Sequence, residues 1–260
     1  MAADGHVHRR YPTDVPGRIG VVILAAGRGE RFGCGPKSAL ELAGRSLLAH
    51  VVAAMSASEH LAEIVVTAPE QFVAETSALL RAARPRVPAR VVVGGSTRQG
   101  SSRAGIAALS GGVDWIAITD VARPLVPFST LDSLLSTMLE DSSDGSPSPE
   151  PQPCGATPAV SIVDSVHLVG RDGRGLAAPV ERDRLRAAQT PQFFRRECIV
   201  DAYEAAFRDG VECTDDVGVM ARAGGRVLAV PGDSANIKIT FERDLHLAEA
   251  LEARQQAAAR

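Results

Sequence analysis

Aromatic residues, paired cysteines and long apolar runs are scarce in this chain of 260 residues. Aromatic side chains make up 4% of it, whereas hydrophobic residues as a group make up 45%, so the core has to be built mainly from Ala, Val, Leu and Ile. The cysteines form no C-x-x-C pair, which argues against a disulfide framework or a zinc site and favours the reducing cytoplasm. No apolar run approaches the roughly 20 residues that cross a bilayer, so no membrane interaction is expected.

An excess of charge of one sign is also missing. The formal net charge is -3, so nucleic acid is not an expected partner and any anion site must be local. Residues 1–17 lack the apolar stretch of a signal peptide, and we expect them to form a disordered N-terminal extension. Length alone allows one domain or two. Residues 18–255 are predicted to form a single domain, because the sequence after the segment 141–153 continues with strand-like runs.

The first half of the chain alternates short apolar runs with helical stretches. Strands are predicted at 18–25, 64–68, 90–93 and 115–119, and helices at 46–55, 70–81 and 98–109. This alternation predicts an α/β fold with a doubly wound, mostly parallel sheet. Because ligands of such sheets bind at the carboxyl ends of the strands, the residues after Leu24, Val93 and Ile118 should converge on one crevice.

The second half is less regular. The segment 141–153, rich in Ser, Pro and acidic residues, is predicted to be a surface loop. Apolar runs at 166–169 and 176–180 flank a glycine-rich turn and predict a β-hairpin. With its flanks at about 163–184, this hairpin either projects as an arm toward a second subunit or folds back on its own domain. The other predicted elements are strands at 159–163 and 226–230 and helices at 183–188, 197–209 and 244–254.

One segment has the residues expected for phosphate binding. The string LAAGRGERFGCGPK, residues 24–37, follows the first predicted strand. Gly27 and Gly29 allow the backbone to turn tightly and present N–H donors to phosphate oxygens. Arg28, Arg31 and Lys37 add the cations that a triphosphate requires. The string matches neither the dinucleotide fingerprint nor the P-loop, so it predicts phosphate binding of another kind.

Carboxylates occur at two further places. Asp120 ends a predicted strand at the crevice, and there a metal-binding role is favoured over a helix cap. Asp215 and Asp216 follow Thr214, and this group is interpreted as a helix N-cap cluster in preference to a carboxylate pair for metal. Arg123, close to Asp120 and before a proline, is predicted to bind an anion.

Six segments in order resemble a known family. They are the string at 24–37, GGSTRQGS at 94–101, TDVARPLV at 119–126, TPQFF at 190–194, TDD at 214–216 and NIKIT at 236–240. Together they resemble the 2-C-methyl-D-erythritol 4-phosphate cytidylyltransferases, over roughly residues 19–251. The resemblance implies transfer of a cytidine nucleotide from CTP to that small phosphoalcohol, with release of pyrophosphate, in the non-mevalonate synthesis of isoprenoid precursors.

The resemblance also implies roles for particular residues. Arg31 and Lys37 would be the catalytic residues that stabilise charge, and Asp120 would hold Mg²⁺ or contact the phosphoalcohol. The nucleotide would be bound by Ala25, Ala26, Gly27, Gly95, Arg98 and Ser101. The acceptor phosphate would be bound by Arg123, Ser165, Arg182, Thr190 and Lys238. Arg182 would reach the site of the partner subunit, which implies a homodimer with exchanged arms.

The sequence departs from the family pattern mainly on the acceptor side. Thr119 stands where the family usually has His, Ser165 replaces a Thr, His167 replaces a Lys and Ala235 replaces an Asp. The segments expected to bind the nucleotide therefore match the family pattern better than the segments expected to bind the acceptor. A related cytidylyltransferase acting on another phosphoalcohol, such as ribitol 5-phosphate, is the first alternative. A catalytically degenerate homologue that binds nucleotide or a partner is the second.

Overall fold

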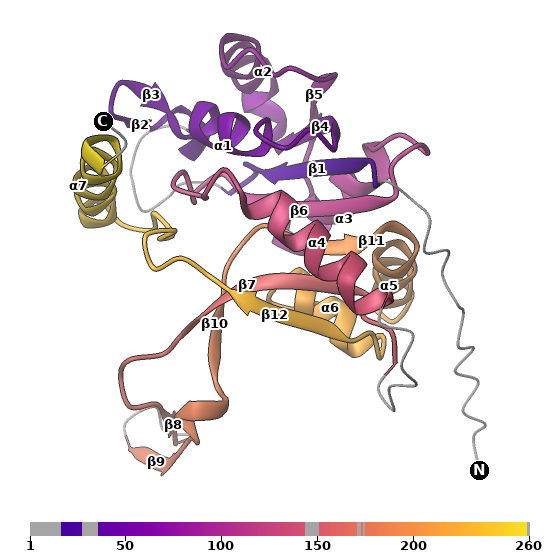
Figure 1. Cartoon of the computed structure of the whole chain (residues 1–260), viewed down its shortest axis with the longest axis vertical. Helices are drawn as coiled ribbons and strands as arrows, with labels where there is room; N and C mark the ends of the chain where they lie inside the picture. Colours follow the sequence, from indigo (N-terminus) through magenta and orange to yellow (C-terminus); the bar gives the residue numbers. More distant parts are fainter. Residues whose placement is uncertain (1–16, 28–35, 144–150, 171–172, 174, 259–260) are drawn as a thin grey trace.

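A mixed sheet with helices on both faces forms the centre of the molecule (Figure 1). The computed structural model describes residues 17–27, 36–143, 151–170, 173 and 175–258. Of the expected N-terminal extension, residues 1–16 lie outside the described residues, as does the part of the expected surface loop at 144–150.

The strands and helices predicted for the first half are all present. They are β1 (Ile19–Leu24), α1 (Leu47–Met55), β4 (Leu61–Ala68), α2 (Val73–Ala82), β5 (Ala89–Val93), α3 (Arg98–Ala108) and β6 (Trp115–Asp120). Short elements that the pattern did not predict lie between them, namely η1 (Lys37–Ala39), β2 (Glu41–Leu42), β3 (Arg45–Ser46) and η2 (Glu70–Phe72). The helix predicted at 70–81 thus begins as a separate 3₁₀ turn, a common start for a helix.

The second half differs more from the prediction. Its elements are α4 (Thr130–Ser143), β7 (Gly155–Ser161), β8 (His167–Val169), β9 (Leu176–Pro179), η3 (Arg182–Arg184), β10 (Arg186–Ala188), β11 (Gln192–Arg195), α5 (Arg196–Arg208), α6 (Asp216–Arg222), β12 (Val227–Pro231) and α7 (Glu242–Ala258). The predicted loop at 141–153 is wrong at its start, because α4 continues to Ser143. The predicted strand at 159–163 begins earlier, at Gly155.

The helix predicted at 183–188 is wrong. A single 3₁₀ turn, η3, is followed by β10, which pairs antiparallel with β7 from Arg186 opposite Ser161 to Ala188 opposite Ala159. Pairing with a distant strand satisfies the backbone N–H and C=O groups of this segment, and such a partner overrides local helix propensity. The strand β11, which the sequence pattern also missed, is inserted antiparallel between β6 and β7.

The sheet has a switch point in its strand order beside β1. The sheet runs β10-β7-β11-β6-β1-β4-β5, with β12 paired to β7. Because β1 pairs in parallel with β4 on one side and with β6 on the other, the order of the strands reverses between β1 and β6. Ligands of doubly wound sheets bind at such a switch point, beyond the carboxyl ends of the strands. Leu24 and Asp120 are register partners there, so the ends of β1 and β6 open on one crevice.

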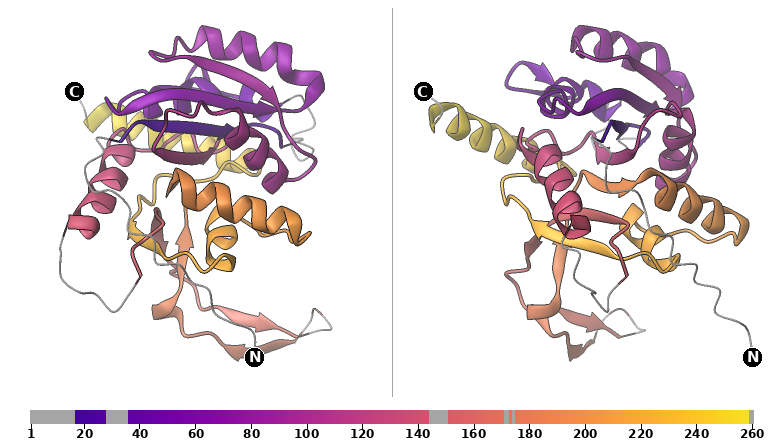
Figure 2. Two further views of the ribbon diagram at one scale, coloured as in Figure 1. Left: turned by 90° about the vertical axis from the view of Figure 1, so that its right-hand side faces the viewer. Right: turned by 45° about the vertical axis from the view of Figure 1, so that its right-hand side comes forward.

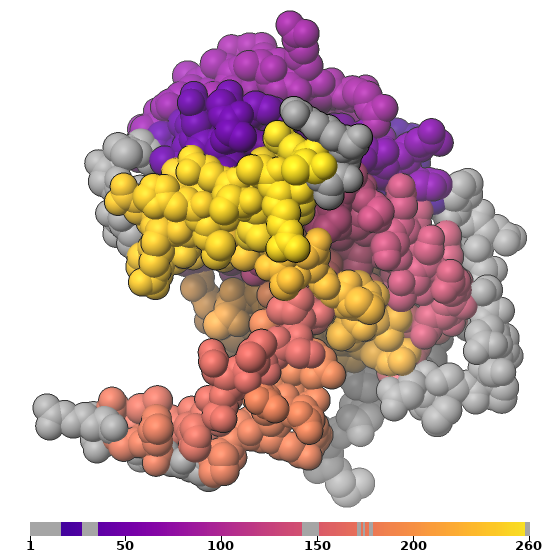
Figure 3. Space-filling model, turned by 60° about the vertical axis from the view of Figure 1, so that its left-hand side comes forward, coloured from indigo at the N-terminus to yellow at the C-terminus, as the bar shows by residue number. Residues whose placement is uncertain are grey.

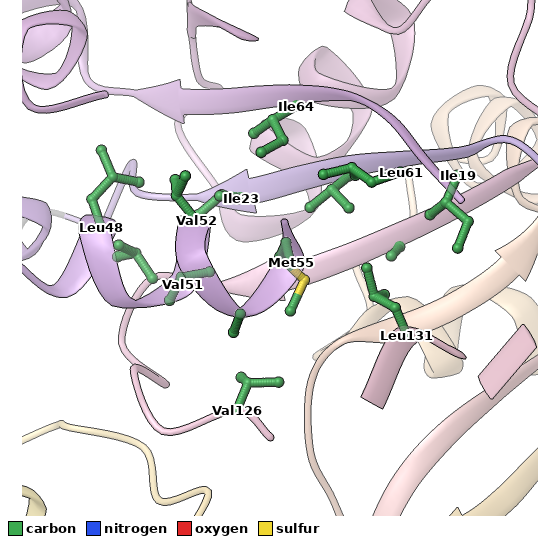
Figure 4. Packing of buried hydrophobic residues seen from close by; sticks show 14 of the residues in the cluster. Ile19, Ile23, Leu48, Val51, Val52, Met55, Leu61, Ile64, Val126 and Leu131 are labelled. Atoms are coloured by element: carbon green, nitrogen blue, oxygen red, sulfur yellow. The ribbon is translucent and has the colours of Figure 1, made fainter. Parts of the chain in front are cut away.

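Apolar residues of β1 alternate between two cores. Ile19 and Ile23 face the core shared with α1, α2, α4 and α7, whereas Val22 faces the core shared with α3, α5 and α6. Figure 4 shows the first core, in which Val52 and Met55 of α1 lie against β1. All five side chains are buried, and each stabilises the fold by about 1.5–3 kcal/mol. Since both faces are covered, the central strands are continuous apolar runs, which confirms the doubly wound fold.

The hairpin projects from the body as an arm. β8 and β9 pair antiparallel in a two-stranded sheet of their own. Figures 1 and 2 show this hairpin below the main sheet, and the space-filling view in Figure 3 shows it extending away from the body. Its apolar side chains are uncovered: Val163 is 85% exposed, Leu168 61% and Leu176 72%. The alternative of a hairpin folded back on its own domain is therefore wrong for this structure.

Among the described residues, no helix is long and apolar enough to cross a membrane.

Candidate active site

A cavity of about 1060 Å³ lies at the switch point of the sheet. Its wall is made by the residues after β1, the segment between β4 and α2, the start of α3, the end of β6 and the segment before α7. This volume is at the upper end of the range for small-molecule sites. The cavity therefore has room for a nucleotide together with a second small substrate.

The residues predicted to bind the nucleotide are brought together in this cavity. Its wall includes Ala25, Ala26, Gly27, Gly95, Arg98 and Ser101. The sequence pattern had placed them on two different strand ends, and the structure joins these ends. The lining also includes η2 with Pro69 before it, a wall that no sequence motif indicated.

The turn between β5 and α3 presents a helix N-terminus to the cavity. The Thr97 side chain caps α3 by accepting a hydrogen bond from the backbone N–H of Gly100 at 3.0 Å. The Ser101 hydroxyl donates to the carbonyl of Thr97 at 2.9 Å. Gly95 has no room for a side chain, since a Cβ there would lie 2.6 Å from the backbone of Gly100. The close turn and the positive end of the helix dipole favour an anion at this point.

Charges of alternating sign run from the protein interior to the cavity. Arg98 Nη2 lies 2.8 Å from Oδ2 of the buried Asp216 and 3.5 Å from Oδ1 of Asp120. The other oxygen of Asp120, Oδ2, lies 2.6 Å from Nζ of Lys238. These four residues come from α6, α3, β6 and the NIKIT segment, so only the tertiary fold aligns them.

The cations around Asp120 keep its carboxyl ionised. Burial is the largest influence and by itself raises the pKa of Asp120, but the attraction of Lys238, Arg98 and Arg123 together holds this pKa below its usual value. Burial lowers the pKa of Arg123, and the attraction of Asp120 opposes this shift without cancelling it. The pKa of Arg98 is raised, because the attraction of Asp216 and Asp120 outweighs the effect of burial. The site therefore holds charged groups at neutral pH.

A depressed pKa at Asp120 predicts a particular dependence of stability on pH. Its ion pairs stabilise the fold fully above the unfolded-state pKa of about 3.9, and this contribution is lost as the pH falls through the lower folded-state pKa. In the Asp120→Asn variant, the surrounding cations repel one another without the negative charge of Asp120 between them. We expect the wild type to have the larger free energy of unfolding, by a margin that is constant above about pH 5 and narrows below about pH 4. Urea denaturation of both proteins across this range measures the margin, and a margin that widens as the pH falls would contradict it.

Lys37 joins the phosphate segment to the NIKIT segment. It stands in η1 after the glycine-rich string, lines the cavity, and donates a hydrogen bond from Nζ to the carbonyl of Ile239 at 3.1 Å. Lys37 and Lys238 therefore reach the same cavity from opposite ends of the sequence. Arg31, the other predicted catalytic residue, lies outside the described residues.

Two of the predicted acceptor residues do not line the cavity but contact segments that form its wall. The Thr190 hydroxyl lies 3.1 Å from the Thr119 hydroxyl and accepts from the backbone N–H of Asp120 at 3.1 Å. Arg123 donates from Nη1 to the carbonyl of Asn236 at 2.6 Å. Thr119, which stands at the family's usual histidine position, therefore supports the β6 end through Thr190. The predicted binding roles of Thr190 and Arg123 stay predictions.

The other two predicted acceptor residues belong to the arm region. Ser165 is exposed beside β8, and Arg182 is exposed in η3 with Nη1 donating to the carbonyl of Val163 at 2.8 Å. Neither lines the cavity of its own chain. Of the residues predicted to bind the acceptor, Lys238 is the one that lines the described cavity.

The TDD segment has the structural role that the sequence indicated, and Asp216 has a further contact. Asp215 is the N-cap of α6 and accepts from the backbone N–H of Gly218 at 2.8 Å. Asp216 turns inward to Arg98. The sequence did not predict this contact, because adjacent acidic residues carry no signal of which one faces a distant arginine.

A magnesium ion fits the residues at the cavity. Mg²⁺ commonly takes one or two carboxylates together with substrate phosphates and water, and Asp120 offers an ionised carboxylate at the wall. Among the described residues there is no cluster of three or more His, Cys, Asp or Glu side chains that would hold a metal alone. Asp120 would therefore bind the ion together with the nucleotide.

The class of protein indicated by this arrangement is a nucleotidyltransferase, because the sheet is doubly wound, glycine-containing turns lie at its switch point and cations surround one carboxylate. The family model described as IspD, 2-C-methyl-D-erythritol 4-phosphate cytidylyltransferase, matches residues 19–254. The chain belongs to this family.

Known proteins are similar to this chain over most of its length. The chain is 41% identical over 254 residues to the 2-C-methyl-D-erythritol 4-phosphate cytidylyltransferase of Streptomyces avermitilis, with 94% of this chain and 96% of the relative covered. It is 39% identical to the bifunctional enzyme IspD/IspF of Clavibacter michiganensis, with 95% of this chain but only 57% of that longer protein covered. The solved structure of the cytidylyltransferase from Thermus thermophilus is similar at 30% identity and a TM-score of 0.68, covering 90% of this chain and 98% of that one.

Proposed function

We propose that this chain couples CTP to 2-C-methyl-D-erythritol 4-phosphate, giving the CDP-alcohol and pyrophosphate in the non-mevalonate synthesis of isoprenoid precursors. The observation that carries the proposal is the meeting of residues 24–27, Lys37, Arg98, Asp120 and Lys238 around one cavity. These residues belong to separate family segments, and each provides a group that a reaction between two phosphates requires.

The reaction is an in-line displacement at phosphorus. A phosphate oxygen of the acceptor attacks the α-phosphorus of CTP, the bond to the bridging oxygen breaks, and pyrophosphate leaves. The acceptor is already anionic near neutral pH, so no strong general base is needed. The protein has to bring two anions together and stabilise the charge that develops.

The cavity residues divide this work with Arg31, which lies outside the described residues. Lys37 and Arg31 neutralise the triphosphate and the leaving pyrophosphate, and the α3 N-terminus with Gly95 fixes the nucleotide. Lys238 attracts the acceptor phosphate toward the same place. Mg²⁺ held by Asp120 would supply further neutralisation of the triphosphate. We also propose that the protein works in the cytoplasm, because its cysteines form no C-x-x-C pair and a reducing compartment suits a chain without a disulfide framework.

A pyrophosphate-release assay with CTP and a panel of phosphoalcohols tests the proposal. We expect turnover with 2-C-methyl-D-erythritol 4-phosphate and little with ribitol 5-phosphate, and CTP should be preferred over ATP, GTP and UTP. Faster turnover with ribitol 5-phosphate would assign the first alternative. CTP binding without turnover on any acceptor would assign the catalytically degenerate alternative.

We further propose that two copies form a homodimer through the arm. The support is the exposed apolar surface of the arm, which includes Leu168, Val169 and Leu176, since uncovered apolar side chains on a projecting hairpin mark an interaction site. Arg182 and Ser165 lie away from the cavity of their own chain. A second copy would therefore receive them at its acceptor site, in a symmetric exchange.

Mixed dimers test whether the arm completes the partner's site. We expect Lys37→Ala and Arg182→Ala to be nearly inactive as separate homodimers. Coexpression of both should restore about one quarter of wild-type activity, because half of the dimers are mixed and each has one intact site of two. Pyrophosphate release and light scattering after size exclusion measure activity and dimer formation. A monomeric wild type, or mixtures no more active than the homodimers, would contradict the exchanged arm.

A further inference from the structure

A fully buried carboxylate lies next to the cavity. Asp216, the first residue of α6, is 0% exposed. Its Oδ2 accepts from Arg98 Nη2 at 2.8 Å, and its Oδ1 accepts from the Ser102 hydroxyl at 2.9 Å and from the Tyr203 hydroxyl. A buried charge is costly unless it is paired and hydrogen-bonded. Arg98 provides the opposite charge for Asp216 within this group of contacts.

Arg98 stands between this carboxylate and the one in the cavity. The contact with Asp216 at 2.8 Å is shorter than the contact with Asp120 at 3.5 Å, so Asp216 is the stronger anchor. The Arg98 side chain is 27% exposed and lines the cavity. Because a guanidinium has five N–H donors, the ion pair with Asp216 leaves donors for a phosphate.

The backbone around Asp216 is held as firmly as its side chain. Gln192 Oε1 accepts from the backbone N–H groups of Asp216 and Val217, each at 2.9 Å. Gln192 Nε2 donates at 2.9 Å to Asp215, the N-cap of α6. Gln192 belongs to β11, which pairs with β6, the strand that ends at Asp120. The sheet that positions Asp120 therefore also positions the backbone of Asp216.

We propose that Asp216 is a positioning residue for the nucleotide, and that it holds the Arg98 guanidinium at the place where Arg98 meets the triphosphate of CTP. This inference rests on the proposed function. Without the charge of Asp216, the guanidinium moves toward Asp120 and competes there with Lys238. The nucleotide then loses a pre-oriented donor, and Asp120 is less accessible.

Asp216→Asn tests the proposal, because asparagine keeps the shape and an acceptor for Ser102 and Tyr203 but loses the charge that holds Arg98. We expect the Kd for CTP, measured by calorimetric titration, to rise roughly tenfold. The KM for CTP should rise with it, while kcat stays within about threefold of the wild type. A purely structural role would lower the melting temperature and leave the Kd unchanged.

Tyr203→Phe is the matched control. It removes a hydrogen bond to the same carboxylate, but on the oxygen that does not contact Arg98. We expect a lower melting temperature with a Kd for CTP within about twofold of the wild type. The proposal is overturned if folded Asp216→Asn binds CTP as the wild type does, or if Tyr203→Phe weakens CTP binding equally.

A second pair of variants decides the matter if Asp216→Asn does not fold. Arg98→Gln leaves the Asp216 carboxylate buried without its cation, so Arg98→Gln/Asp216→Asn should melt at a higher temperature than Arg98→Gln. The two should bind CTP with equal Kd, because Asp216 acts only through Arg98. Weaker binding by the double variant overturns the proposal. Failure of the wild type itself to bind CTP would instead refute the proposed function.

Discussion

Replacement of Lys37 by alanine is expected to lower kcat by roughly 100-fold, the usual cost of removing one electrostatic partner of a developing charge. Lys37 lines the cavity and ends the segment expected to bind phosphate, so it is placed beside the expected triphosphate and leaving pyrophosphate. The KM for CTP should change less than kcat, because the charge that Lys37 meets grows in the transition state. Pyrophosphate release at saturating CTP and acceptor measures the effect.

Arg45→Ala is a suitable control for Lys37→Ala. Arg45 is a nearby exposed cation whose guanidinium donates to the carbonyl of Ala49 and does not line the cavity. Its loss changes the net charge by the same amount, and we expect kcat within about twofold of the wild type. A decrease in kcat of less than threefold for Lys37→Ala, in protein with the wild-type melting temperature, would remove Lys37 from the catalytic residues.

Replacement of Asp120 by asparagine should also be severe, lowering kcat by roughly 10²–10³-fold. Asparagine has the same shape but loses the charge that would hold Mg²⁺ and that pairs with Arg98 and Lys238. The affinity for metal-free CTP, in contrast to kcat, should not decrease. Since the cavity becomes more positive, the variant should bind metal-free CTP at least as tightly as the wild type does.

Calorimetric titration of metal-free CTP, together with steady-state kinetics over a range of Mg²⁺ concentrations, separates the two effects. Asp114→Asn is the control, because Asp114 is another aspartate near β6 whose carboxylate accepts from the backbone N–H of Arg18 outside the cavity. If Asp120→Asn lost CTP binding and turnover together, Asp120 would act by holding the site in shape. A metal role would then have no support.

The features that the sequence predicted well depend on local patterns. The strands β1, β4, β5 and β6 are short apolar runs, and the helices between them show helical spacing. The segment that ends at Lys37 was recognised because a phosphate site needs glycines and cations close together in the chain. The hairpin β8–β9 was found from its turn residues.

The features that the sequence did not predict depend on partners far away in the chain. The residues of β10 have a helical pattern and become a strand only because β7 offers a pairing edge. Whether the hairpin would project or fold back was undecided, because turn residues specify the hairpin and not the surface on which it lies. Asp216 could be assigned to a cap cluster, but its contact with Arg98 spans 118 residues.

The sequence by itself determined that this protein is a doubly wound α/β nucleotidyltransferase, and it predicted a phosphate-binding segment that ends at Lys37. Periodicity and short motifs carry that information, because they reflect interactions between near neighbours in the chain. Only the tertiary structure decided that Asp216, Arg98, Asp120 and Lys238 alternate in charge beside one cavity, and that the arm leaves its own body. These features arise from burial and from strand pairing between distant segments, and both exist only once the sheet has formed.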